Sequence, residues 1–382
     1  MVDLSKALLA VFKEGLALAT TFERIFGQSP ILTTSGRASL YAILRSLHLS
    51  KGSRVGVPLF CCPVVFGAIE QAGLVPKFID INLANYNLSA VDLEKKRKCI
   101  SAMVVVHMFG HPADMHSISR VCSEVPIIED CAQSLFSMYK GRYTGFESTA
   151  SFYSFRSGKY ISAGEGSAIF CNDHSLLSTI KDLVKGFEKR SVLQEISHCS
   201  AIFMKSFFYQ KPWYGLFGSP IGRMLDKRLN LTAKNGFECR QISKGDSAII
   251  GRKIEGFIKE VNKQRENALA LLQNIRIEEA ILPIEKEHCF SNYYQFAIRF
   301  RDPDHRDFVA DYLLRSGIDA AKYLDEVVDL ARDRFGYAGD CPNAEFASKT
   351  VLVIPHYYTL SDKELNHIAD TLNEAGKQLA KS

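Results

Sequence analysis

The stretch from Ser151 to Cys171 reads SFYSFRSGKYISAGEGSAIFC, and the interpretation of the whole chain starts from it. Two apolar runs flank a turn of small residues, so the pattern predicts two strands with Lys159 on the turn between them. Partial withdrawal from water favours the neutral lysine amine, which attacks carbonyl carbons. The stretch therefore points to a lysine that forms a Schiff base, and a solvated loop lysine is the alternative.

Upstream of this stretch, short apolar runs alternate with helical patterns. Strands are expected at 54–58, 76–81, 102–107 and 126–129, and helices at 64–72, 89–97 and 114–122. The run that begins at Ala102 is continuously apolar up to its final histidine, as in a strand buried on both faces. This alternation predicts an α/β fold with a mainly parallel sheet, in which ligands lie beyond the carboxyl ends of the strands.

Asp130 is expected at such a carboxyl end, because it directly follows the apolar run that starts at Val125. Burying a carboxylate without a cationic partner is costly, and a protonated pyridine nitrogen would be a suitable partner. An aspartate that caps a helix is the alternative interpretation.

A second candidate binding feature is the predicted helix start around Ser35, Gly36 and Arg37. The free N–H groups and the positive end of a helix dipole favour an anion there, above all a phosphate. Taken alone, this segment is explained as well by a helix cap without a ligand.

Composition indicates an ordered protein, since 47% of the 382 residues are hydrophobic and no low-complexity block is present. The net charge of +5 comes from basic and acidic residues spread along the chain, which argues against nucleic-acid binding. Ten irregularly spaced cysteines indicate reduced thiols and a cytoplasmic location. Charged residues interrupt the apolar N-terminus, so neither a signal peptide nor a spanning helix is expected.

The patterns divide the chain into four parts: a helical segment 1–30, a large α/β domain 31–189, an insertion 190–236 and a small α+β domain 237–382. The last part contains a long helical pattern at 246–275 and an alternating strand at 293–300. A further helix begins at Asp302-Pro303, and Ser361 opens the final helix with a capping box.

The insertion departs from the α/β rhythm between Ser191 and Leu231. It is rich in aromatic and basic residues and contains the only tryptophan, Trp213. Such a segment suits peripheral contact with a membrane or with a lipid-bearing substrate. We favour the other interpretation, an insertion that packs on the protein or against a partner subunit.

Several blocks recur together in a fixed order and spacing from about Thr33 to the end of the chain. They are Ser35-Gly36, Pro58 with Ala68-Ile69, Val106-His107, Ile128-Glu129-Asp130 with Ala132-Gln133, Ser154-Phe155 with Lys159, and Gly164-Glu165-Gly166. This set resembles the sugar aminotransferases of the DegT/DnrJ type, a branch of the fold-type-I pyridoxal phosphate (PLP) enzymes. The resemblance implies a large domain with a seven-stranded sheet and a homodimer with shared active sites.

The resemblance also implies roles for individual residues. Lys159 would form the Schiff base with PLP, Asp130 would hold the pyridine nitrogen protonated, and Gln133 would lie beside the ring hydroxyl. Gly36 and Ser154 would bind the phosphate. No metal is implied, because the lysine that binds the cofactor can also move the proton.

Three positions depart from the family pattern. Arg37 stands where a threonine is usual, Cys62 where an aromatic ring usually stacks on the cofactor, and Glu238 where an asparagine of the other subunit usually reaches the phosphate. We hypothesise that Arg37 binds the phosphate through a bidentate contact and that Glu238 pairs with Arg37. Arg156, Arg240 and Tyr323 are candidate substrate-binding residues.

The leading hypothesis is a PLP-dependent aminotransferase. It would move an amino group from an amino acid, probably glutamate, to a nucleotide-linked keto sugar in surface polysaccharide or amino-sugar biosynthesis. The alternatives are a PLP enzyme that acts on a lipid-linked or other hydrophobic ketone, and a PLP-fold sensor or interaction protein without turnover. Dehydratase relatives replace the lysine with histidine, so Lys159 favours transamination.

Overall fold

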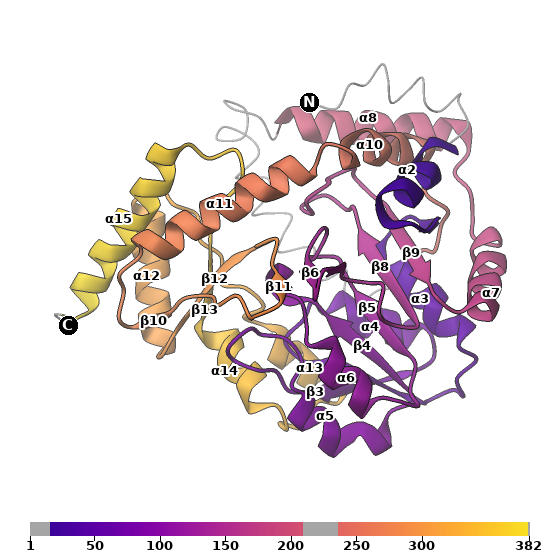
Figure 1. Ribbon diagram of the computed structural model, residues 1–382, viewed down its shortest axis with the longest axis horizontal. Helices are drawn as coiled ribbons and strands as arrows, with labels where there is room; N and C mark the ends of the chain where they lie inside the picture. Colours follow the sequence, from indigo (N-terminus) through magenta and orange to yellow (C-terminus); the bar gives the residue numbers. More distant parts are fainter. Residues whose placement is uncertain (1–15, 209–235, 381–382) are drawn as a thin grey trace. The chain divides into compact units, whose positions relative to one another are not determined.

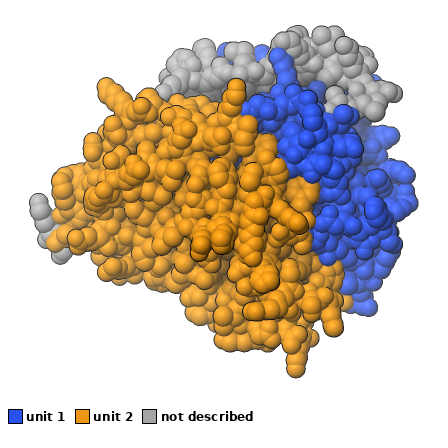
Figure 2. Space-filling model, in the orientation of Figure 1, with its two compact units in different colours: residues 1–52, 63–74, 148–257 blue, residues 53–62, 75–147, 258–382 orange. Residues whose placement is uncertain are grey.

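The computed structural model describes residues 16–208 and 236–380 (Figure 1). Contacts divide the chain into two compact units, which Figure 2 colours separately. Unit 1 contains the described residues within 1–52, 63–74 and 148–257, and unit 2 contains those within 53–62, 75–147 and 258–382. This division differs from the predicted boundary at residue 236, because each unit combines segments that are far apart in the sequence.

Three antiparallel strands form the sheet of unit 1. They are β1 (Ile31–Thr33), β8 (Ala150–Ser154) and β9 (Ser167–Cys171), in the order β1-β9-β8. Leu32 lies opposite Ala168, and Phe152 lies opposite Ile169. The prediction of two strands that flank Lys159 is therefore confirmed.

The helices of unit 1 are α2 (Leu16–Phe26), α3 (Gly36–Ser46), α4 (Val64–Gln71), α7 (His174–Lys185), α8 (Val192–Phe208) and α10 (Lys244–Ile254). Helix α10 packs against α2 and α8, which assigns residues 244–257 to this unit. The predicted helix 246–275 is thus two helices, α10 and α11 (Ile258–Asn274). Gly256 lies in the break between them, where glycine's weak helix propensity favours an interruption.

Aromatic packing holds α2 in place. The Phe22 side chain is fully buried, and its ring centroid lies 5.8 Å from those of Phe155 and Phe170. Phe26 stacks on Tyr153 of β8 at the same centroid distance. Burial of aromatic rings is a major source of stability, so α2 anchors the part of the chain that leads into the lysine loop.

Unit 2 contains the parallel strands β2 (Arg54–Pro58), β3 (Val75–Ile79), β4 (Ala102–Val106) and β5 (Ile127–Asp130), in the order β5-β4-β2-β3. Helices α5 (Ala90–Lys96) and α6 (Met115–Val121) separate these strands along the chain. All five residues of β4 are buried, as predicted for a strand covered on both faces. These four strands and the three strands of unit 1 make up the seven strands of the main sheet. The predicted α/β fold is therefore confirmed.

The C-terminal part of unit 2 has a second, antiparallel sheet. Its strands are β10 (Ala280–Ile281), β12 (Phe296–Phe300) and β13 (Val351–Ile354). Residues of α11, α12 (Pro303–Arg315) and α15 (Asp362–Leu379) share a buried apolar core with this sheet. Figure 1 labels these three helices and the strands of the sheet. Asp302 caps α12, and Ser361 and Glu364 form the predicted capping box of α15.

The remaining elements of unit 2 are short: the three-stranded sheet β11 (Cys289–Phe290), β6 (Met138–Tyr139) and β7 (Arg142–Tyr143), the helices α13 (Val327–Phe335) and α14 (Pro342–Thr350), and 3-10 turns at 97–99 and 108–110. All ten cysteines of the chain lie in the described residues and are free thiols. The interpretation of the cysteines as reduced thiols agrees with this.

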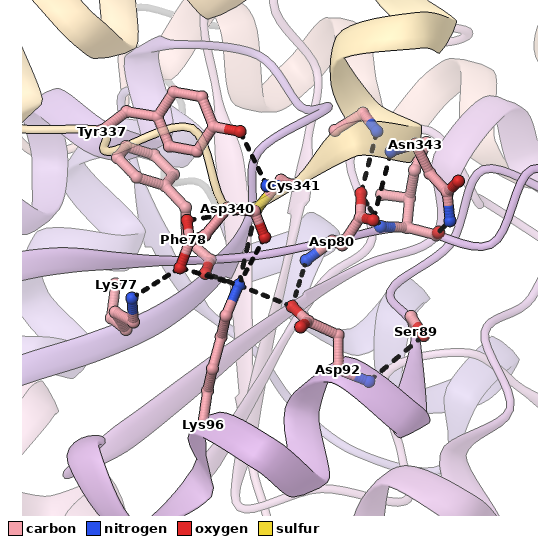
Figure 3. A network of polar contacts seen from close by, with 12 residues as sticks. Lys77, Phe78, Asp80, Ser89, Asp92, Lys96, Tyr337, Asp340, Cys341 and Asn343 are labelled. Atoms are coloured by element: carbon pink, nitrogen blue, oxygen red, sulfur yellow. Dashed lines mark hydrogen bonds and ion pairs between the residues drawn. The ribbon is translucent and has the colours of Figure 1, made fainter.

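A buried aspartate joins β3 to the start of α14 (Figure 3). The carboxylate of Asp80 accepts hydrogen bonds from the N–H groups of Asn343 at 3.2 Å and Ala344 at 2.8 Å. These are first-turn N–H groups of α14, which have no partner within the helix. Asp80, which directly follows β3, therefore caps a helix from 263 residues earlier in the sequence.

Lys96 extends the same network. Its Nζ lies 2.8 Å from a carboxylate oxygen of Asp92 and 3.0 Å from one of Asp340. It also donates to the carbonyl oxygens of Phe78 and Asp340. Burial alone would lower the pKa of Lys96, but the bonds to Asp92 and Asp340 raise it above its ordinary value. Lys96 thus stays protonated and stabilises the fold through its ion pairs with Asp92 and Asp340.

Removing the charge of Asp80 should weaken this junction. We expect Asp80→Asn to lower the free energy of unfolding by about 1–3 kcal/mol, because an amide accepts fewer of the α14 N–H bonds and lacks the favourable charge. Thermal unfolding measures the change. Asp182→Asn, at an exposed position that pairs with Lys185, is the matched control and should shift the midpoint little. Equal shifts for the two variants would contradict the capping role.

Buried His356 should make unit 2 sensitive to acid. Its Nε2 lies 2.6 Å from the Tyr293 carbonyl oxygen, and burial lowers the pKa of His356 to about 4. The unfolded chain binds this proton near pH 6.5, so stability is complete above that pH and is lost as the pH falls toward 4. The loss should approach about 3 kcal/mol for this side chain.

Unfolding of wild type and His356→Gln at pH 7 and pH 4.5 checks this expectation. The difference in unfolding free energy between the two proteins should shrink at the lower pH, because the variant lacks the titrating group. His367→Gln, on the exposed side of α15, is the control and should keep a constant difference from wild type. A difference for His356→Gln that does not change with pH would contradict the assignment.

Candidate functional site

The loop of Lys159 joins β8 to β9 in unit 1. The Phe155 N–H donates to the carbonyl of Gly166 at 2.8 Å, and the Ser157 N–H donates to that of Gly164 at 3.1 Å. These bonds continue the antiparallel pairing beyond the two strands. Lys159 itself is half-buried, which agrees with a lysine stem partly withdrawn from water.

The same loop is tied to the start of α3. The N–H of Gly166 donates to the carbonyl oxygen of Thr34 at 2.6 Å. Ser35 caps α3 by accepting a hydrogen bond from the Ala38 N–H at 3.2 Å. The lysine loop and the N-terminus of an eleven-residue helix are thus fixed in one small region of unit 1.

Gly36 opens α3 at close range to β8. A Cβ atom on Gly36 would lie 3.1 Å from the Phe152 ring and 3.5 Å from the Cβ of Ser154. The backbone at the helix start therefore approaches the half-buried Ser154 side chain. Helix N–H groups beside a hydroxyl provide donors suited to a phosphate, as predicted for Gly36 and Ser154.

The segment before α10 runs beside the start of α3, because the Thr34 N–H donates to the carbonyl of Arg240 at 3.2 Å. Glu238 pairs with Arg240, and the Arg37 guanidinium lies over the Phe237 ring, 5.2 Å from its centroid. Within one chain the carboxylate of Glu238 thus pairs with Arg240. The hypothesised pair between Arg37 and Glu238 concerns a second subunit and stays a prediction.

Arg240 and Arg156 differ in their surroundings. Arg240 has two acidic neighbours, since Glu188 also accepts from it at 3.3 Å. Arg156 is exposed on the lysine loop, and its carbonyl accepts from the Lys159 N–H at 3.0 Å. Of the two candidates, Arg156 is the more accessible to an anionic ligand.

In unit 2, Asp130 is the last residue of β5 and is buried. Its Oδ1 accepts a hydrogen bond from the Ala132 N–H at 2.9 Å, which closes a turn after the strand. The residues that follow, 131–137, form turns, so the alternative interpretation of Asp130 as a helix cap is wrong. Its position at the carboxyl end of a parallel strand is the one that was predicted.

Gln133 has a fixed amide orientation. Its Oε1 accepts from the N–H of Phe109 at 3.0 Å, so its Nε2 points to the Tyr323 hydroxyl at 3.3 Å. The Tyr323 ring packs against Phe109 and Phe60, with centroids at 5.2 and 6.5 Å. Burial raises the pKa of Tyr323 well above its ordinary value, so its hydroxyl stays neutral.

Cys62 belongs to the same part of unit 2. It is half-buried, and after burial Cys62 and Cys61 are among the groups that raise the pKa of Tyr323. Burial, then Cys62 and Asp130, raise the pKa of Cys61 well above its ordinary value. Unit 2 thus brings together four predicted site residues: Cys62, Asp130, Gln133 and Tyr323.

Phe109 was missed in the sequence, although its N–H orients Gln133. It has a positive φ of 58° in the short turn Met108–Gly110, directly after His107 at the end of β4. A glycine soon after the end of a buried strand was the available signal, because ligand-binding loops follow such strand ends.

His107 and Glu129 support this region from the interior. The Nε2 of His107 lies 2.9 Å from a carboxylate oxygen of Glu129, while its Nδ1 accepts from the Ala113 N–H. Because Nδ1 accepts, the proton of the neutral ring is on Nε2. Glu129 also accepts from the N–H of Gly145 at 2.8 Å. The hydrogen bonds of this carboxylate fix the turns after β4 and β5.

The donor sets of the two units match different parts of PLP. Unit 1 offers an amine, a helix N-terminus and a hydroxyl, which suit the aldehyde and the phosphate. Unit 2 offers a buried carboxylate and an oriented amide, which suit the ring nitrogen and the ring hydroxyl. The residues present therefore fit this cofactor.

A sequence model of the DegT/DnrJ/EryC1/StrS aminotransferase family matches residues 9–373. The chain belongs to this family. Membership makes it an aminotransferase, and the family indicates PLP as the cofactor. The resemblance seen in the sequence is therefore confirmed.

Relatives of known name cover most of the chain. GDP-perosamine synthase of Escherichia coli O157:H7 is 25% identical over 344 residues, 89% of this chain and 84% of that protein. The dTDP-4-dehydro-2,3,6-trideoxy-D-glucose 4-aminotransferase of Saccharopolyspora spinosa is 24% identical over 353 residues, 90% and 84% of the two chains. Both relatives are similar to this protein along nearly its whole length.

Solved structures confirm the fold. The aminotransferase TlmJ from Streptoalloteichus hindustanus has a TM-score of 0.79 at 21% identity and covers 99% of this chain and 96% of its own. An E. coli GDP-4-keto-6-deoxy-D-mannose-3-dehydratase with bound hydrated PLP has a TM-score of 0.74 at 17% identity and covers 97% and 96%. A dehydratase shares the fold, so the fold alone does not define the reaction.

The lysine loop itself can be tested through its glycines. Gly166 has a φ of +132°, and a Cβ there would lie 2.8 Å from the Cδ1 of Ile250. We expect Gly166→Ala to lower the unfolding midpoint by several degrees and to weaken PLP retention. Gly158→Ala is the control, with φ +89° and no described atom within 4 Å of the added Cβ. Equal losses would show that backbone strain, not packing of the loop, is responsible.

Proposed function

We propose that this aminotransferase transfers an amino group from an amino acid, with glutamate as the leading candidate, to a nucleotide-linked keto sugar. The observation that carries the proposal is Lys159 on a hydrogen-bonded loop, tied to the capped start of α3, in a chain of this family. The names of the relatives support the substrate class. They refer to sugars linked to GDP, dTDP or, in a Pseudomonas aeruginosa relative 30% identical over 164 residues, UDP.

The proposed cofactor contacts are assigned within each unit by itself. Lys159 would bind the aldehyde, while Gly36, Ser154 and Arg37 would bind the phosphate. Asp130 would face the ring nitrogen, and Gln133 would face the ring hydroxyl. When bound, PLP supplies an electron sink for the bond that breaks at the amino-bearing carbon.

The protein groups have separate tasks in this proposal. The half-buried amine of Lys159 would hold and return the proton that leaves the substrate carbon, a task for which a partly desolvated lysine is suited. The buried carboxylate of Asp130 would keep a proton on the ring nitrogen through a charge-assisted hydrogen bond. Gln133 would donate through Nε2, because its Oε1 is occupied by the Phe109 N–H.

Other residues would shape the acceptor site. Arg156 is exposed on the lysine loop, and its guanidinium suits the phosphates of a nucleotide. Tyr323 would position Gln133 as well as line the substrate site. A thiol at Cys62 leaves more room at the cofactor face than an aromatic ring. Glu238 and Arg240 neutralise each other within the chain.

A lipid-linked or other hydrophobic ketone is a second candidate acceptor. It is favoured by exposed apolar side chains on α8, which include Val192, Leu193 and Met204. The rest of the predicted contact segment, up to Leu231, lies outside the described residues. In residues 16–208 and 236–380, no helix has the length and apolarity needed to cross a bilayer. Peripheral membrane contact, a homodimer and a cytoplasmic location stay proposals.

Substitution of the lysine tests the cofactor assignment. We expect Lys159→Ala to lose the visible absorbance of bound PLP and at least about a thousandfold in amino transfer, because covalent attachment and proton transfer both depend on this amine. Lys181→Ala, on the exposed face of α7, is the control and should keep colour and activity. Retained colour and turnover in Lys159→Ala would contradict the assignment.

An acceptor comparison distinguishes the candidates. With glutamate as donor, GDP-, dTDP- and UDP-linked keto sugars should accept the amino group, whereas lipid-linked ketones should not. Transfer only to lipid-linked ketones would support the second candidate. Bound PLP without conversion of any amino acid would support the third hypothesis, a sensor without turnover.

A further inference from the structure

A cluster of charged side chains in unit 1 has no role in the proposed chemistry. Glu165 follows Gly164 on the lysine loop, His198 lies on α8, and Asp246 lies on α10. One potential ligand atom from each of the three side chains lies within 4.8 Å of the other two. The three elements that meet here therefore bring one nitrogen and two carboxylate groups together.

Asp246 is the buried member of the cluster, with no exposed side-chain surface. Its Oδ2 lies 2.7 Å from the Nε2 of His198. Its Oδ1 is also buried and has no hydrogen-bond partner among the described residues. A buried carboxylate oxygen without a partner is costly, so this atom can accept a further donor or a cation.

The carboxylates around the cluster outnumber its cationic groups. Arg190 donates to Glu165 at 2.5 Å and also acts on His198 and Asp246. Glu195 is buried nearby and accepts from the Ser243 hydroxyl. Glu165 and Asp246 thus share one guanidinium, which leaves one negative charge without a cationic partner while His198 is neutral. A metal cation bound to these carboxylates would supply positive charge.

We propose that Glu165, His198 and Asp246 bind one zinc ion. One imidazole nitrogen with two carboxylate oxygens, and water in the fourth position, is a donor set that zinc accepts. The ion would bind the unpartnered Oδ1 of Asp246 and the Nε2 of His198, which would give up the proton that it now shares with Oδ2 at 2.7 Å.

The bound water could also satisfy Arg190. The Nη1 atom of this guanidinium is buried and has no hydrogen-bond partner in the described parts of the chain. The oxygen of a zinc-bound water keeps a lone pair that accepts a hydrogen bond. The proposed ion therefore accounts for the two unsatisfied atoms of the cluster together, the Oδ1 of Asp246 and the Nη1 of Arg190.

The position of the cluster gives the ion an entry path and a structural effect. The Glu165 side chain is 41% exposed, so the site is open to solvent on that side. A Cβ on Gly164 would lie 3.2 Å from Asp246 Oδ1 and 2.4 Å from Ile202 Cδ1, so the loop backbone is packed on α8 and α10. Zinc would thus join the loop that follows Lys159 to the first helix of the insertion.

Metal titration of the full-length, PLP-loaded protein tests this proposal. After treatment with a chelator and dialysis, calorimetric titration with zinc chloride should show one ion per chain, and magnesium chloride should not compete. His198→Gln keeps a hydrogen bond to Asp246 but loses the metal ligand, so its affinity should fall at least about tenfold. Glu165→Gln should weaken binding in the same direction.

His288→Gln is the matched control, because His288 is an exposed histidine that also lies beside a glutamate, Glu287. Its zinc affinity should equal that of wild type. Titrations in buffers of different ionisation enthalpy should also show that zinc displaces a proton from wild type and not from His198→Gln. Absence of a stoichiometric site, or equal affinity in wild type and His198→Gln, would overturn the proposal and leave a proton-bridged His–Asp pair.

Discussion

Backbone hydrogen bonds from Phe155 to Gly166 and from Ser157 to Gly164 hold the loop of Lys159, and the candidate site of unit 1 depends on them. They extend the pairing of β8 with β9, so the lysine projects from a closed loop instead of a free one. The N–H of Gly166 then binds Thr34, which fixes the capped start of α3 beside the same loop. An amine and a capped helix N-terminus are thereby placed by backbone contacts, and such a helix end can bind an anion.

Buried carboxylates show a second constraint. Asp80 accepts hydrogen bonds from N–H groups of α14, and Glu129 accepts them from His107 and the Gly145 N–H. Both negative charges are therefore stabilised inside the fold. Such compensation is required because an unpaired buried charge is strongly destabilising. Asp130 accepts from the Ala132 N–H at the end of β5, and the ring nitrogen of PLP is the cation that its proposed role supplies. Asp80 and Glu129 thus support the fold, and the role of Asp130 in the chemistry is part of the proposal.

Local patterns explain what could be predicted from the sequence. The strand ending at Asp130, the strands on either side of Lys159, and the caps at Asp302 and Ser361 each depend on neighbouring residues, so all were found. The assignment of residues 244–257 to unit 1 and the cluster around Asp246 were not, because they depend on contacts between distant segments. His198 and Asp246 are 48 residues apart, and no local pattern indicates that α8 and α10 pack together.

The central claim is that the amine at position 159 holds the cofactor. Borohydride reduction of the purified, PLP-loaded protein traps an imine as a stable amine, and mass spectrometry of the digested protein locates it. The account predicts a pyridoxyl phosphate group on Lys159, in stoichiometric amount and on no other lysine. Label on a different lysine, or a protein that binds PLP without any reducible linkage, would contradict it.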